Sequence, residues 1–287
     1  MHSQILMRQL FLCAIMVLIF SGNTFALRPE KNYSVTPDSM GIPSWNIHLK
    51  TSDGYEINAW LFLPKKEVDK KRVLIISGGD AGNMSYYIYQ AFNLTKKGFR
   101  VITYDYRGFG KSSNFQINND YLYYDEFVTD LQSVINYADS NYKDCKIGLY
   151  GFSMGNLISG FAAAKNPNIR FFIAEGFILD PVKLVYRIKE TTKANDKETR
   201  QIILPESATQ YAEIIKNLKI PFLVFAGTDD THTPLVDAIE GIKQQKNREL
   251  VVYDGVHGQA MARLTATKLT GDRFFDDIEG FADGWLQ

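Results

Sequence analysis

The chain has 287 residues, with 32 basic and 32 acidic side chains, so its formal net charge is zero. No basic stripe or run of like charge is present, which argues against nucleic acid as a partner. Aromatic residues make up 13% of the chain, which argues against disorder and indicates a packed core.

The first 26 residues have the pattern of a secretory signal. Arg8 is their only basic residue, an unbroken apolar run spans residues 10–20, and small residues lead up to Ala26. We expect cleavage after Ala26 and export to a bacterial periplasm or medium, with no stable membrane insertion afterwards. An uncleaved N-terminal anchor is the alternative. Cleavage would leave Cys145 as the one cysteine, so stability would not depend on an intramolecular disulfide.

Residues 27–287 are enough for one large α/β domain. After a polar lead-in, two strand patterns at 46–50 and 55–63 flank Ser52-Asp-Gly54, which predicts a hairpin. The second strand carries Ile57, Ala59, Leu61 and Leu63 on one face. Strands and helices then alternate, which predicts a mostly parallel, doubly wound sheet with an antiparallel edge. The predicted strands are 73–76, 100–104, 146–150, 171–174, 221–225 and 250–252, and the predicted helices are 84–97, 124–137, 154–165 and 234–246, with two amphipathic helices closing the chain.

Ser153 stands in the pattern G-x-S-x-G between Gly151 and Gly155, with a predicted strand before it and a helix after it. That context is typical of a nucleophilic serine on a strained turn, exposed at the top of a sheet. A glycine-rich turn that carries an ordinary serine is the alternative interpretation.

A serine hydroxyl needs a base to activate it, and the base needs an acid to orient it. The chain has four histidines; His2 lies in the signal and His48 in the first strand. His257 follows the last predicted strand, at the sheet edge where Ser153 also lies, so it is the candidate base. Asp229 and Asp230 follow the strand at 221–225, and both are candidates for the acid.

The segment after that strand resembles the α/β-hydrolase family, whose pattern is G-x-x-D-x-x-[TV]-P; it matches at Gly227, Asp230, Thr233 and Pro234. The resemblance favours Asp230 as the acid. It also implies the chain order serine, aspartate, histidine that this fold uses. His232 lies inside the motif at a position without a family role, so we expect it at a pocket rim or on the surface.

An oxyanion hole needs backbone N–H groups directed at the developing alkoxide. Residues 77–85 resemble the H-G-N-A-G-N-M-S loop of membrane-associated esterase-like proteins, a branch close to the serine aminopeptidase-like hydrolases. The resemblance implies N–H donors at Asp80 and, after the nucleophile, at Met154. Gly78 stands where the family has histidine, which removes the usual brace of the loop. The Asp80 carboxylate would oppose an oxyanion unless its side chain points away.

Residues 105–112 resemble the D-x-R-G-x-G-x-S loop of the same family, a structural feature in which we expect Arg107 to pair with a carboxylate. Asp105 stands where a phosphate-binding loop requires glycine, which argues against an ATPase. No Cys, His and Asp cluster has metal-ligand spacing, so we expect neither a metal nor a cofactor.

The sequence therefore predicts an exported serine hydrolase of the α/β-hydrolase fold, most simply a carboxylesterase acting on a small-molecule acyl substrate. A peptidase or thioesterase of the same fold, and a non-catalytic binding protein, are the alternatives. The insert at 180–219 carries apolar clusters at 184–188, 202–204 and 211–218. These either roof an apolar pocket over Ser153 or pack onto the sheet.

Overall fold

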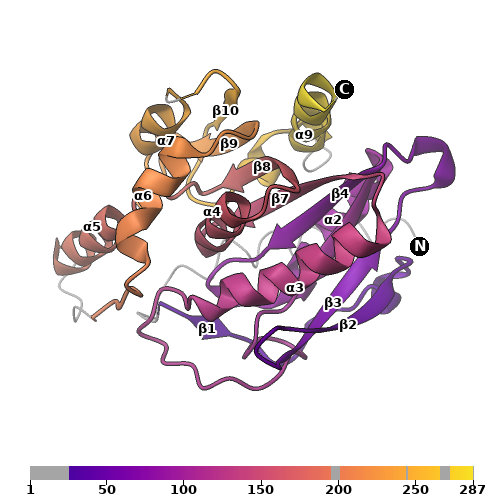
Figure 1. Ribbon diagram of the computed structural model, residues 1–287. Coiled ribbons are helices and arrows are strands. Elements are labelled where there is room, and N and C mark those ends of the chain that lie inside the picture. Colours follow the sequence, from indigo (N-terminus) through magenta and orange to yellow (C-terminus); the bar gives the residue numbers. More distant parts are fainter. Residues whose placement is uncertain (1–25, 195–200, 244, 266–271, 287) are drawn as a thin grey trace.

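A computed structural model describes residues 26–194, 201–243, 245–265 and 272–286 (Figure 1). The predicted signal, apart from Ala26, lies outside the described residues. The described part contains a sheet of eight strands in the order β10-β9-β8-β7-β4-β6-β3-β2. Their bounds are β2 Trp45–Lys50, β3 Glu56–Phe62, β4 Arg72–Ser77, β6 Phe99–Tyr104, β7 Lys146–Phe152, β8 Ile169–Glu175, β9 Phe222–Gly227 and β10 Arg248–Tyr253.

The sheet is parallel from β10 to β6 and antiparallel at its other edge, where β3 pairs with both β6 and β2. This confirms the predicted hairpin and the mostly parallel sheet. The apolar face predicted for this strand is buried except at its end, and β3 is buried on its other face as well. Residues 57–62 are all buried, whereas Leu63 is 39% exposed. The reason is that β3 contacts α2 as well as α3, so neither of its faces meets solvent.

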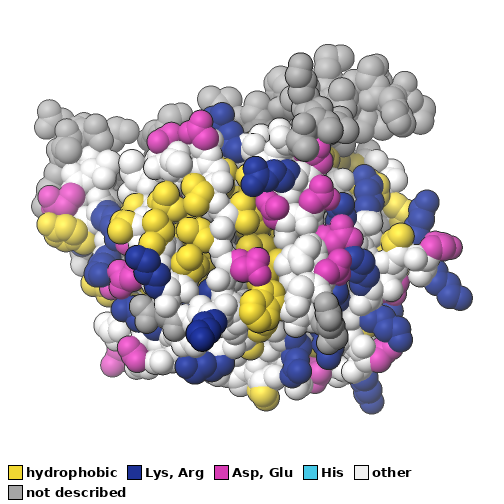
Figure 2. Space-filling view, turned by 90° about the horizontal axis from the view of Figure 1, so that it is seen from above, with side chains coloured by type: hydrophobic (Ala, Val, Ile, Leu, Met, Phe, Trp, Pro, Cys, Tyr) yellow, Lys and Arg dark blue, Asp and Glu magenta, His cyan; other side chains and the backbone are white. Residues whose placement is uncertain are grey.

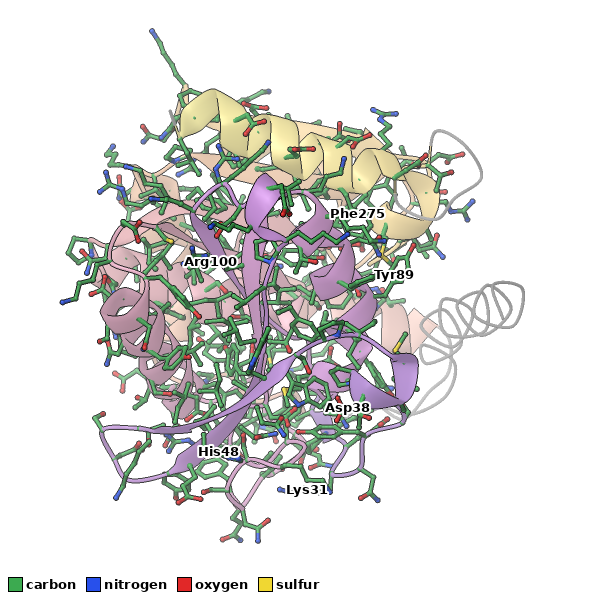
Figure 3. The ribbon with its side chains drawn as sticks, turned by 90° about the vertical axis from the view of Figure 1, so that its right-hand side faces the viewer. Lys31, Asp38, His48, Tyr89, Arg100 and Phe275 are labelled. Carbon is green, nitrogen blue, oxygen red and sulfur yellow. The ribbon has the colours of Figure 1, made fainter. Side chains whose placement is uncertain are left out.

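Helices cover both faces of the sheet (Figure 1). On one face, Leu131 of α3 and Leu157 of α4 join a core cluster, and on the other Leu94 of α2 and Ile278 of α9 join a second one. Tyr89 and Phe275, labelled in Figure 3, hold α2 against α9 with their ring centroids 6.2 Å apart. The helices are α2 Ile88–Lys96, α3 Glu126–Asn141, α4 Met154–Lys165, α5 Pro181–Ala194, α6 Ala208–Asn217, α7 Leu235–Ile242, α8 Ala260–Arg263 and α9 Asp272–Trp285, and the 3₁₀ turns are η1 Asp38–Met40, η2 Lys66–Val68 and η3 Met84–Tyr87.

Two helical predictions differ from the structure. The helix predicted for 234–246 ends as α7 at Ile242, and the first of the two closing helices is only the single turn α8. The apolar pattern of α9 is real, since Phe274, Phe281 and other residues on that side are buried. Among the described residues, no helix combines the length and apolar character needed to cross a membrane.

The insert at 180–219 forms α5 and α6, which have different surroundings. Tyr211 of α6 is fully buried and its hydroxyl donates to the Asn156 carbonyl at 2.9 Å, so α6 packs directly onto α4. On α5, Leu184 and Val185 are buried, whereas Tyr186 is 65% exposed. Of the two alternatives for the insert, packing against the body of the fold describes α6. The helix α5 instead lies at the border of the site described below.

The exposed edge of the sheet at β10 is apolar. Val252 of β10 is 42% exposed and Val236 of the neighbouring α7 is 65% exposed. Figure 2 shows hydrophobic side chains gathered on this upper face of the molecule. The opposite edge strand β2 instead presents polar side chains such as His48 at the surface (Figure 3). The strands β4, β6 and β3 separate β2 from β7, the strand that ends before Ser153.

The loop at 105–112 is held by ion pairs and hydrogen bonds of charged side chains. The Arg107 guanidinium, 1% exposed, pairs with Asp130 at 2.7 Å and with Asp53 at 2.6 Å. The Asp105 carboxylate accepts the N–H groups of Met84 at 2.8 Å and Lys111 at 3.1 Å. Because Met84 lies just after the loop at 77–83, Asp105 ties the two loops together.

Candidate active site

Ser153 lies on the sharp turn between β7 and α4. Its φ is +50° and its ψ −117°, a conformation that costs a non-glycine residue about 1–3 kcal/mol. The turn brings α4 close to β4: a Cβ at Gly155 would lie 2.1 Å from the Ser77 carbonyl oxygen. Glycine is therefore required at that position of the G-x-S-x-G pattern. Ser153 itself lies at the carboxyl edge of the sheet, directly after β7.

Asn156 stabilises this turn from within the core. Its side-chain amide donates to the carbonyl oxygens of Ser153 at 2.9 Å, Glu175 at 3.0 Å and Gly176 at 2.9 Å. The Ser153 N–H also donates to the Glu175 carbonyl at 2.9 Å. One buried side chain thus joins the turn to the end of β8.

The structure brings Ser153, His257 and Asp230 together. His257 Nε2 lies 3.0 Å from Ser153 Oγ, and His257 Nδ1 lies 2.7 Å from Asp230 Oδ2. Since the carboxylate can only accept, the tautomer with hydrogen on Nδ1 leaves Nε2 to accept the serine proton. The neighbouring Asp229 is exposed, in agreement with the choice of Asp230.

The Asp230 carboxylate accepts four hydrogen bonds. Oδ1 accepts the N–H groups of His232 and Thr233 at 2.9 Å, and Oδ2 accepts the Thr233 hydroxyl at 2.6 Å besides His257. Burial would raise the pKa of Asp230, but the hydrogen bonds from His257 and Thr233 hold it below its usual value. Asp230 is therefore ionised at neutral pH, and the threonine of the sequence motif acts on the carboxylate itself.

The environment of His257 shifts its pKa in two opposing directions. Burial lowers the pKa of the imidazole, but the hydrogen bond and the charge of Asp230, followed by the charges of Asp80 and Glu175, raise it above its usual value of 6.5. The ring side chain is 7% exposed, so these charges act in a poorly hydrated environment.

Two residues of the site were missed by sequence reasoning. Gly176 has φ +61°, and a Cβ there would lie 2.4 Å from His257 Cε1, so glycine makes room for the imidazole. Glu175 is buried, and its carboxyl accepts the Tyr150 hydroxyl at 2.5 Å and the Ala260 N–H at 3.0 Å, joining the strands to the segment that follows His257. Burial raises the pKa of Glu175. The sequence offered one signal for these two residues, since an acidic residue and a glycine directly follow the predicted apolar strand at 171–174.

His232 lies half-buried beside His257, with the two ring centroids 6.2 Å apart. Burial, and then the proximity of His257, lowers the pKa of His232. The carbonyl of His232 accepts from Arg187 of α5 at 3.5 Å, and Arg187 pairs with Asp237 of α7 at 2.7 Å. We expected His232 at a pocket rim or on the surface. The structure places it between His257 and the helix α5.

The loop at 77–83 lies beside the serine. The N–H groups of Asp80 and Met154 donate to no described residue, whereas the Gly79 N–H donates to the Tyr87 hydroxyl at 2.9 Å. A Cβ at Gly78 would lie 2.9 Å from the Tyr87 ring, so the tyrosine fills the space beside this position. Tyr87 therefore braces the loop at the position where the sequence has Gly78.

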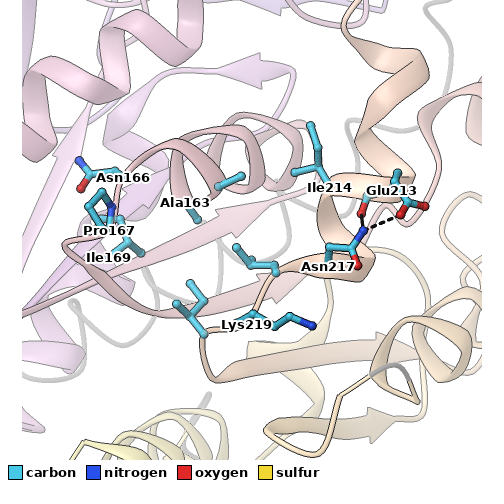
Figure 4. A pocket seen from close by; sticks show the side chains of 11 residues that line it. Ala163, Asn166, Pro167, Ile169, Glu213, Ile214, Asn217 and Lys219 are labelled. Atoms are coloured by element: carbon cyan, nitrogen blue, oxygen red, sulfur yellow. Dashed lines mark hydrogen bonds between the residues drawn. The ribbon is translucent and has the colours of Figure 1, made fainter.

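A separate open pocket of about 490 Å³ lies at the far end of α4 (Figure 4). Ala163 and Asn166 line it from the end of α4, and Ile214 and Asn217 line it from α6. Since α4 rises about 1.5 Å per residue, this pocket is more than 10 Å from Ser153 and takes no part in the site.

We expect Asp230→Asn to lower the pKa of the His257 imidazole, because it removes the charge that favours the imidazolium. Asp229→Asn, the matched control on the exposed neighbour, should leave that pKa unchanged. Histidine NMR titration of the two variants measures both values. A larger change in Asp229→Asn would mean that the sequence motif has been aligned one residue off.

Several known proteins are similar to this chain in sequence or in fold. Residues 68–194 match the family described as serine aminopeptidase, S33. The uncharacterized membrane protein YNL320W of Saccharomyces cerevisiae is 31% identical over 165 residues, which span 55% of this chain and 52% of the yeast protein. The uncharacterized protein YfhR of Escherichia coli K12 is 26% identical over 260 residues, 87% of this chain and 84% of YfhR.

Among solved structures, the Pyrococcus furiosus esterase Pf2001 has a TM-score of 0.69 with this chain at 18% identity, covering 91% of this chain and all of the esterase. The parallel sheet, the strand–turn–helix at Ser153 and the matched sequence family all lead to one conclusion. The chain has the α/β-hydrolase fold, and its residues 68–194 are similar to the serine aminopeptidase, S33 family.

Proposed function

We propose that the protein is a serine hydrolase that cleaves acyl esters, with Ser153, His257 and Asp230 as its catalytic residues. The observation that carries the proposal is the hydrogen-bond chain from Ser153 Oγ through the two nitrogens of His257 to Asp230, at 3.0 Å and 2.7 Å. That arrangement is the one a serine nucleophile needs at neutral pH.

In the proposed reaction, Ser153 Oγ attacks the acyl carbon while His257 Nε2 takes its proton. Asp230 holds the imidazole in the required tautomer and stabilises the imidazolium. The backbone N–H groups of Asp80 and Met154 accommodate the negative charge of the tetrahedral intermediate. His257 then returns the proton to the leaving alcohol. In the second half of the reaction water attacks the acyl carbon while His257 takes its proton, and the acid leaves as that proton returns to Ser153 Oγ.

The strain at Ser153 supports a functional role for this serine. A positive φ at a serine is retained where the surroundings enforce it, and such positions concentrate at functional sites. Peptide and thioester cleavage use the same serine, histidine and aspartate. The name of the matched family favours a peptidase and that of the Pyrococcus relative an esterase. Ester cleavage is the primary proposal because it needs no pocket for a peptide chain.

We expect purified wild-type protein to react with a labelled fluorophosphonate and to hydrolyse simple esters, because only an activated serine does both. Ser153→Ala should abolish labelling, and Ser153→Ala and His257→Ala should each lower kcat by about 10³-fold or more. The exposed Ser140→Ala and His48→Ala variants are the matched controls and should retain wild-type rates. Full activity in Ser153→Ala would overturn the proposal.

The position of α5 suggests the size of the acyl group. Arg187 connects α5 to the carbonyl of His232, next to His257, and Leu184 and Val185 face inward from the same helix. We propose that α5 borders an apolar acyl pocket of limited length. Rates on p-nitrophenyl esters should peak at short or medium chains and then fall, each methylene contributing up to about 0.8 kcal/mol until the pocket is full. A monotonic rise to long chains, or activity on emulsified lipid alone, would contradict this.

We further propose that the protein is exported, with the signal cleaved after Ala26. Mass spectrometry of the exported protein should then find its N-terminus at Leu27. Recovery of the intact N-terminus in membranes would instead identify an anchor.

A further inference from the structure

The segment directly after the predicted signal lies along the loop that contains Asp80. β1 Arg28–Pro29 pairs in parallel with β5 Ala81–Gly82, forming a two-stranded sheet apart from the main one (Figure 1). The Arg28 N–H donates to the Asp80 carbonyl at 2.8 Å, and the Glu30 N–H donates to the Gly82 carbonyl at 2.9 Å. We call residues 26–30 the strap.

The strap is anchored at both ends. Leu27 is fully buried in the main core cluster, and its N–H donates to the Asn119 carbonyl at 3.0 Å. At the other end, the Glu30 carbonyl accepts from Gly110 at 2.9 Å and from the side chain of Asn83 at 3.1 Å. The strap therefore has a fixed position beside the loop, and its side chains have fixed positions too.

Arg28 brings a positive charge to the Asp80 carboxylate. Its Nη2 lies 3.6 Å from Asp80 Oδ2, and each side chain is 22% exposed. The pair forms where a negative charge would be most harmful, because the N–H of Asp80 is the proposed oxyanion donor. The Asp80 charge also reaches the base, since it is among the causes that raise the pKa of His257.

We infer that Arg28 is a positioning residue of the proposed active site: its guanidinium offsets the Asp80 carboxylate, so that the loop offers the oxyanion an N–H group without a net negative charge. The strap supplies the charge that the loop sequence lacks. This inference rests on the proposed function, because it assigns Arg28 a role in the ester hydrolysis carried out by Ser153.

The test is a double-mutant cycle on the full-length protein. Arg28→Ala should lower kcat by about 10- to 100-fold with little change in KM, the scale of one unpaired charge a few ångströms from a developing oxyanion. Asp80→Asn keeps the backbone N–H and removes the charge that Arg28 offsets, so adding Arg28→Ala to Asp80→Asn should cost far less than the about 10- to 100-fold that it costs in the wild type. The double variant should regain most of the rate that Arg28→Ala loses, and Arg28→Lys, which keeps the charge, should retain most of it.

The pH profile separates this electrostatic role from simple packing. His257 is surrounded by Asp230 and His232 of the β9–α7 loop, Asp80 of the loop at 77–83 and Glu175 of β8. Arg28→Ala leaves the Asp80 charge without its nearby cation, which favours the imidazolium. The acid limb of kcat/KM should therefore move to higher pH, and Asp80→Asn should move it back.

Arg273→Ala, on the exposed face of α9, is the matched control and should change neither kcat nor the pH profile. Wild-type rates in Arg28→Ala, an unmoved acid limb, or a double variant no better than Arg28→Ala would each overturn the inference. A wild-type protein that hydrolyses no ester and takes no fluorophosphonate label would instead overturn the proposed function, so the two failures are distinguishable.

Discussion

The close contact between α4 and β4 is the constraint on which the site depends. Gly155 lies so near the Ser77 carbonyl that no side chain fits, and Ser153 in the same turn has a positive φ. The strain is tolerated because a buried amide, that of Asn156, donates to three carbonyl groups around the turn. A strained residue in a well-anchored surrounding keeps its hydroxyl fixed before any substrate arrives, which is what catalysis by orientation requires.

Two buried carboxyl groups near the serine have different environments and therefore different roles. Asp230 accepts two backbone N–H groups, a hydroxyl and the imidazole, and these bonds keep it ionised beside His257. Glu175 receives only the Tyr150 hydroxyl and the Ala260 N–H, and burial raises its pKa. In the proposed reaction Asp230 orients His257, whereas Glu175 fixes the segment that follows His257. The pKa values of the two groups shift in opposite directions because more hydrogen bonds stabilise the charged form of Asp230.

The loop at 77–83 shows how a departure from a family pattern can be accommodated. With glycine at position 78, the brace comes from Tyr87, whose hydroxyl accepts the Gly79 N–H, and from the Tyr106 hydroxyl, which donates to the Gly78 carbonyl at 3.0 Å. The strap then adds a strand on the outer side of the same loop. Two tyrosine hydroxyls and one paired strand thus hold this short segment through its own backbone groups.

Local patterns in the sequence determined the α/β class, the parallel sheet with its antiparallel hairpin, and the placement of Ser153, His257 and Asp230 at one edge, because each follows the end of a strand. The same patterns could not place Arg28, Glu175 or Gly176. Their roles depend on contacts between segments distant in sequence. Arg28 contacts Asp80, Glu175 accepts the first N–H of α8, and Gly176 lies against the imidazole of His257. Periodicity and motif spacing describe neighbours along the chain, and only the tertiary structure decides which charges meet across it.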